Sequence, residues 1–137
     1  MSPAKWHSPA IISSVAFAAF SAAHLIDDFI SDVPREFHLS VEIAMILALA
    51  FMAALVGLIA AASARSPAGY LGLAIAGVLI ASAQLVKSVP EMIPAGPWHL
   101  GLSSEVLAVG LAISASLTAV FSFFAWAAYR RRADAMR

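Results

Sequence analysis

Three side chains that can carry charge close the first long apolar segment of the chain. His24, Asp27 and Asp28 are spaced i, i+3 and i+4, so they share one face of an α-helix. Ionisable groups are costly inside a membrane, and they usually face a bundle interior or a water-filled cavity there. This triplet therefore marks a candidate functional site at the end of the segment.

A second polar group, Gln84 and Lys87, closes the third apolar segment about 60 residues later. We expect the two groups to lie at one depth and to form an outward-facing pocket with polar residues of the other two segments. A purely structural alternative is that Lys87 pairs with Asp27 or Asp28 and ties the two halves together. The predicted ligand-binding residues are His24, Asp27, Asp28, His38, Glu42, Gln84, Lys87, His99 and Glu105.

Three functions are compatible with such a pocket. The first is binding or transport of a cation or small polar ligand, with Asp27, Asp28 and Glu42 as its core and His24 as a protonation switch. The second is an enzyme that uses Asp27, Asp28 and His24 in acid–base catalysis on an isoprenoid, quinone or lipid, because adjacent carboxyl groups do not easily both ionise. The third is a non-catalytic accessory subunit of a membrane complex, so enzymatic activity stays an open question.

Some of the same residues are types that bind metals. His24 with Asp28, and His38 with Glu42, are i, i+4 pairs that could ligate Zn, Mn or Fe from one helix face. No double-histidine zinc motif is present, so the sequence names no particular metal or cofactor. The chain has no Cys, which excludes thiolate ligands and thiol redox chemistry.

The composition is that of a membrane protein. Hydrophobic residues make up 62% of the 137 residues and charged residues only 12%, whereas a soluble domain has about 25% charged residues. The net charge is formally zero and no basic patch with interleaved aromatic residues is present, so nucleic acid is not an expected partner. The expected partners are the lipid bilayer and a small ligand or cation.

The hydropathy pattern predicts four membrane-spanning helices over residues 10–30, 40–64, 68–88 and 102–129, each long enough to cross a bilayer core of ~30 Å. Ser40 is the expected N-cap of the second helix. The first apolar run continues past the small residues 21–23 to Ile26, which favours a retained helix over a cleaved signal peptide. The predicted fold class is all-α, a four-transmembrane-helix bundle that forms a single integral membrane domain over residues 1–137.

The two halves of the chain, residues 1–66 and 67–137, resemble each other. Leu25 matches Leu85, and Pro34 matches Pro94, at the same offset. Two hairpins of the same topology would be parallel repeats related by a two-fold axis along the membrane normal. Small residues also recur every fourth position, for example Ala53, Gly57 and Ala61 or Ala108, Ala112 and Ser116. Because small residues let helices approach closely, we expect a homo-oligomer.

In layout the chain resembles small four-helix membrane proteins of the DoxX-like kind. The shared features are an acidic start to the second helix, residues 41–43 (Val-Glu-Ile), and a Gly-rich third helix, residues 69–73 (Gly-Tyr-Leu-Gly-Leu). The resemblance implies an accessory redox or quinone-linked role in a membrane. The small-residue and basic pattern of those proteins is replaced at the end of the first helix by residues 21–28, so the resemblance assigns no functional residue.

The distribution of basic residues predicts that both termini are cytoplasmic (N-in/C-in), in a prokaryotic plasma membrane. In that orientation only Arg35 and Lys87 face outward. A reporter that works only in the cytoplasm should be active when it is fused at residue 66 or at the C-terminus. A reporter that works only outside the cytoplasm should be active when it is fused near residue 97. The opposite pattern would contradict the prediction. The basic residues placed inside are Lys5, Arg65, Arg130, Arg131, Arg132 and Arg137.

Overall fold

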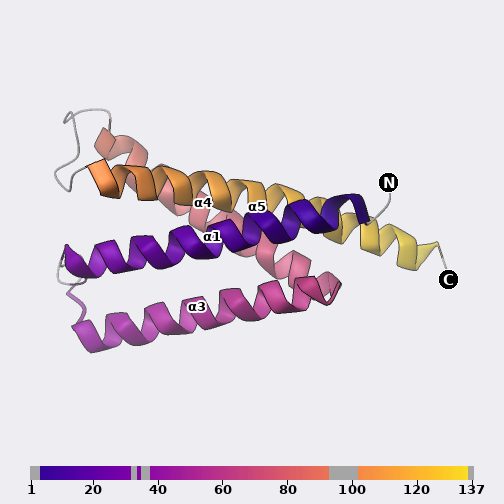
Figure 1. Ribbon diagram of the computed structural model, residues 1–137, viewed down its shortest axis with the longest axis horizontal. Coiled ribbons are helices and arrows are strands. Elements are labelled where there is room, and N and C mark those ends of the chain that lie inside the picture. The colour runs from indigo at the N-terminus through magenta and orange to yellow at the C-terminus, as the bar shows by residue number, and fades with distance from the viewer. Residues whose placement is uncertain (1–3, 32–33, 35–37, 93–101, 136–137) are drawn as a thin grey trace.

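The protein is an all-helical bundle (Figure 1). The computed structural model describes residues 4–31, 34, 38–92 and 102–135. In these ranges it contains four α-helices, each long and apolar enough to cross a membrane. They are α1 (Ala4–Ile30), α3 (Val41–Ser63), α4 (Pro67–Met92) and α5 (Leu102–Asp134).

Helix α5 is the most extensively packed element, because it lies along both α1 and α4. Helix α3 makes fewer contacts, with α1 and α4. The start of α1 and the end of α5 lie at the same end of the bundle (Figure 1), which we call the basic end because it carries Lys5, Arg65 and Arg130. The opposite end carries Asp28 and Glu42 and is called the acidic end.

Helix α3 and the start of α4 follow the sequence prediction closely. Helix α3 was expected over residues 40–64, and Ser40 is its N-cap, with the Ile43 amide donating to Ser40 Oγ at 3.3 Å. Helix α4 starts at Pro67. The N–H of the first helical residue makes no bond within the helix, so proline, which has no N–H, suits this position. A short turn at Arg65 and Ser66 joins these two helices, with Arg65 at a positive φ of 60°.

The outer helix boundaries differ from the prediction. Helix α1 starts at Ala4 instead of residue 10, so Pro9 lies inside it. A proline this near the N-terminus removes a single helical hydrogen bond. The first turns are held by tertiary contacts, because Trp6 stacks on Phe124 of α5, with ring centroids 4.8 Å apart, and His7 hydrogen-bonds to Tyr70 of α4.

Helices α4 and α5 are longer than predicted at their C-terminal ends. Helix α4 continues through Pro90 to Met92, although the third helix was expected to end at residue 88. Helix α5 continues beyond Tyr129 to Asp134. Arginine has a high helix propensity, and cations are favourable in a last helical turn. The arginines therefore mark the end of the apolar span without ending the helix.

Small side chains make the contacts at the centre of the bundle. Helix α5 buries Ala115, Thr118 and Ser122, whereas Ser116, which was expected on its packing face, is exposed. Helix α3 buries only Leu55 and Ala62. The small-residue stripes predicted for these two helices therefore pack only in part, because Ala108 is buried and Ala61 partly buried, whereas Gly57 and Ser116 are exposed. The predicted homo-oligomer, the internal repeat and the membrane orientation stay predictions.

Gly77 is the point at which α4 and α5 approach backbone to backbone. A Cβ atom at this position would lie 2.5 Å from the carbonyl oxygen of Ala115 and 2.8 Å from the amide nitrogen of Ala119. A Cβ at Gly57 of α3 would have no neighbour within 4 Å. The two glycines therefore form a matched pair for testing the packing.

We expect Gly77→Ala to destabilise the protein by about 1–3 kcal/mol, because the added methyl group forces the helices apart. Gly57→Ala should be neutral or slightly stabilising, because alanine favours the helix and meets no neighbour. Unfolding of both variants in detergent micelles measures the difference. Equal stability of the two variants would show that this packing is incorrect.

Candidate functional site

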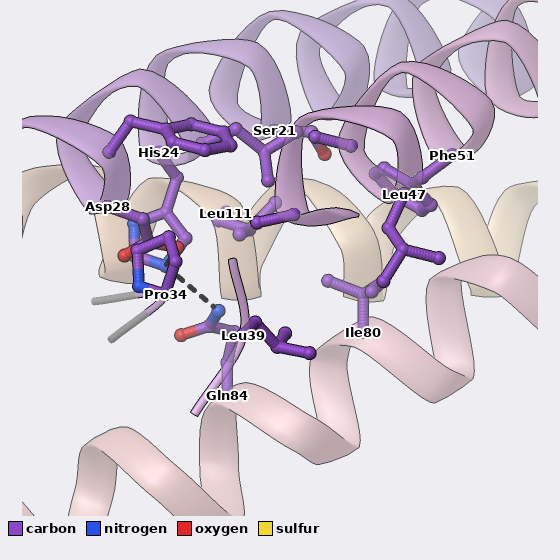
Figure 2. A pocket seen from close by; sticks show the side chains of 14 residues that line it. Ser21, His24, Asp28, Pro34, Leu39, Leu47, Phe51, Ile80, Gln84 and Leu111 are labelled. Carbon is purple, nitrogen blue, oxygen red and sulfur yellow. Dashed lines mark hydrogen bonds and ion pairs between the residues drawn. The ribbon is translucent and has the colours of Figure 1, made fainter. Parts of the chain in front are cut away.

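A cavity of about 390 Å³ opens between α1, α3 and α4 toward the acidic end (Figure 2). Its volume is within the range of ~300–1,000 Å³ that is usual for small-molecule sites. Most of its wall is apolar, including Leu47 and Phe51 from α3, Ile80 from α4 and Leu111 from α5. The cavity can therefore surround the hydrophobic part of a ligand.

A small polar cluster forms one side of this cavity. It consists of Ser21, His24 and Asp28 from α1 and Gln84 from α4. Figure 2 shows Gln84 reaching toward His24, with 3.4 Å between the Nε2 atoms of the two side chains. Asp28 Oδ2 lies 3.9 Å from His24 Nε2.

Two buried polar atoms of this cluster have no hydrogen-bond partner among the described residues. They are His24 Nδ1 and Ser21 Oγ. The nearby Ser14 differs, because its hydroxyl donates to the Ala10 carbonyl at 2.6 Å. An unsatisfied buried polar group costs about 1–3 kcal/mol. The cluster can therefore gain stability from a ligand that carries a hydrogen-bonding group.

The structure brings together only part of the predicted pocket. His24, Asp28 and Gln84 line the cavity. Asp27 is partly buried on the adjacent position of α1, and Glu105 is partly buried in the first turn of α5. Neither is among the described residues that line the cavity.

The other predicted residues are exposed or lie outside the described region. Glu42 is exposed in the first turn of α3, where a carboxylate is favourable to the helix dipole. His38 is also exposed and has a positive φ of 56°. For Lys87 the structure describes the backbone within α4 but not the side chain, and His99 lies outside the described residues.

The residues proposed as metal ligands do not form a cluster. Among the side chains that the structure describes, no three of His, Asp or Glu are grouped so that they could hold a metal ion. His24 and Asp28 lie near each other, but His38 and Glu42 are not grouped with them. The geometry gives no support to a metal centre built from these four side chains.

A second polar contact, which was not predicted from the sequence, lies at the basic end. His7 Nδ1 of α1 hydrogen-bonds to the hydroxyl of Tyr70 in α4. Tyr70 is fully buried, and its ring stacks on Tyr129 of α5 with centroids 5.5 Å apart. A tyrosine inside an apolar segment needs a partner for its hydroxyl, and that requirement was the signal available in the sequence. This contact connects three helices.

No protein-family model, curated protein or solved structure matches this chain. The resemblance to DoxX-like proteins therefore stays a prediction.

The contact between His24 and Gln84 can be measured with a double-mutant cycle. We expect His24→Phe and Gln84→Leu to show a coupling free energy of about 0.6 kcal/mol, and at most ~1.7 kcal/mol, which is the range for hydrogen bonds between membrane helices. The cycle of His24→Phe with Leu85→Ala is the control, because Leu85 is exposed. A coupling near zero for the first pair, or equal values for both pairs, would contradict the contact.

Proposed function

We propose that the protein binds an amphipathic, lipid-soluble molecule of the isoprenoid, quinone or lipid class in the cavity between α1, α3 and α4. The polar group of the ligand, a carbonyl or hydroxyl, forms hydrogen bonds with Ser21 and His24. The apolar part contacts the wall that includes Phe51 and Ile80. The observation that carries the proposal is a largely apolar cavity with a small polar side formed by Ser21, His24, Asp28 and Gln84.

The chemistry of the cavity favours this ligand over a free cation. A cation site needs several oxygen ligands that converge on one point. Of the three carboxylates expected to form its core, Asp28 lines the cavity, whereas Asp27 and Glu42 are not among the described lining residues. Transport of a cation or small polar ligand is therefore the less favoured hypothesis, and a role as a non-catalytic accessory subunit stays a prediction without a specific contact to support it.

Acid–base catalysis on the same ligand is a second candidate function. It is favoured by the distance of 3.9 Å between His24 Nε2 and Asp28 Oδ2 at the cavity wall. A carboxylate beside an imidazole can hold the ring in position and stabilise its protonated form, as general acid–base catalysis requires. In this role His24 would exchange a proton with the bound ligand and Asp28 would orient His24.

Binding can be tested with the full-length protein in lipid nanodiscs. The probes are a benzoquinone with a short isoprenoid tail and an isoprenoid alcohol. Ala48 lines the cavity on α3, whereas Ala50 is exposed two positions further along the same helix. We expect Ala48→Phe to weaken binding of at least one probe by about tenfold or more, because the ring fills the cavity. Ala50→Phe should leave binding unchanged.

The polar contact is tested with Ser21→Ala. Loss of one hydrogen bond should weaken binding about fivefold, which corresponds to about 1 kcal/mol. Failure of both probes to bind the native protein would overturn the proposal, especially if cations then bind in a manner that depends on Asp28. Product formation from a bound probe that is lost in His24→Gln would establish the catalytic alternative.

A further inference from the structure

A second depression lies on the outer surface of the bundle, between α4 and α5. Its volume is about 490 Å³. It shares no lining residue with the cavity described above. All of its described lining side chains are apolar, and those that define its two sides are Leu71, Ile75 and Val78 from α4 and Val120, Phe123 and Phe124 from α5.

This groove has the length of one membrane leaflet. On α4 its lining residues extend from Leu71 to Leu79, which is a rise of ~12 Å along a helix. Half of a bilayer core measures ~15 Å. The groove therefore matches the hydrocarbon region of a single leaflet, on the side of the membrane nearest to the basic end.

Two cations are connected to the groove through aromatic rings. Phe124 stacks on Trp6 with centroids 4.8 Å apart, and the Lys5 ammonium lies 5.5 Å from the centre of the Trp6 ring. Phe123 contacts Trp126 with centroids 5.7 Å apart, and the Arg130 guanidinium lies 5.5 Å from that ring. One indole ring therefore lies between each cation and an aromatic side chain that lines the groove.

The contacts of Lys5 and Arg130 leave their charges accessible. Both side chains are exposed, and stacking on an indole holds a cation without neutralising it. Two accessible positive charges therefore lie at the basic end, each held on an indole ring that contacts an aromatic side chain of the groove.

From this arrangement we propose that the groove binds one anionic phospholipid. An acyl chain lies in the groove between α4 and α5, and the phosphate of the headgroup interacts with Lys5 and Arg130. Basic residues at the end of a membrane helix attract anionic lipids, and the groove adds a defined place for the chain. This site is independent of the cavity at His24 and of the function proposed for it.

The proposal can be tested by native mass spectrometry of the full-length protein in detergent. Phosphatidylglycerol and phosphatidylcholine with identical acyl chains are the probes. We expect phosphatidylglycerol to be retained preferentially, and Lys5→Gln with Arg130→Gln to reduce its retention by about tenfold, because two cations are lost. Arg131→Gln with Arg132→Gln removes the same charge from the same end, and it should change retention much less, because Lys5 and Arg130 keep their places on the two indole rings.

The acyl-chain part of the site needs its own variant. Ile75 lines the groove, whereas Ile113 is equally exposed on α5 but does not line it. Ile75→Trp should reduce retention of phosphatidylglycerol with all charges intact, and Ile113→Trp should not. Helical content and thermal unfolding of each variant confirm that it is folded.

Three results would overturn the proposal. Equal losses in the two double variants would mean that the basic end attracts anionic lipid diffusely. Equal retention of phosphatidylcholine would mean that the cations play no part. Full competition by glycerol phosphate, which carries no acyl chain, would mean that the groove plays no part and that only a phosphate group is recognised.

Discussion

Close approach of helix backbones is the constraint on which this fold depends. In a bilayer, lipid tails are as apolar as leucine side chains, so hydrophobicity does not drive helices together and packing has to do so. Helices α4 and α5 meet at Gly77, where even one methyl group would collide with the backbone at Ala115 and Ala119. This contact fixes the two helices against each other, and α1 then packs along the other side of α5.

Two polar contacts add to this packing by linking α1 to α4. His24 contacts Gln84 toward the acidic end, and His7 contacts Tyr70 at the basic end. Each contact satisfies polar groups that would be costly to leave unpaired in an apolar bundle. Because α3 packs less extensively, the space between it and α1 and α4 remains open, and the cavity forms there. The candidate site is thus a consequence of how unevenly the four helices share their contacts.

The same uneven packing explains the chemical character of the site. The cavity wall consists mostly of apolar side chains because its helices are apolar enough to cross a membrane, and its polar atoms come from the parts of α1 and α4 toward the acidic end. A ligand that suits such a wall has a small hydrogen-bonding group and a larger hydrophobic body. A cluster of several carboxylates would have required α3 to bring Glu42 inward, whereas Glu42 lies exposed in the first turn of that helix.

The sequence by itself determined the number of helices, their approximate limits and the cap at Ser40, because each depends on local hydropathy and on one nearby hydrogen bond. It also indicated that His24 and Gln84 lie at the same depth in the bundle, since each is near the end of an apolar segment. Only the tertiary structure decided which polar residues converge, that α1 begins at Ala4, and that His7 meets Tyr70. These features depend on how far each helix is rotated about its axis. Such rotation is set by contacts between helices such as the one at Gly77, and the pattern within a single helix does not specify it.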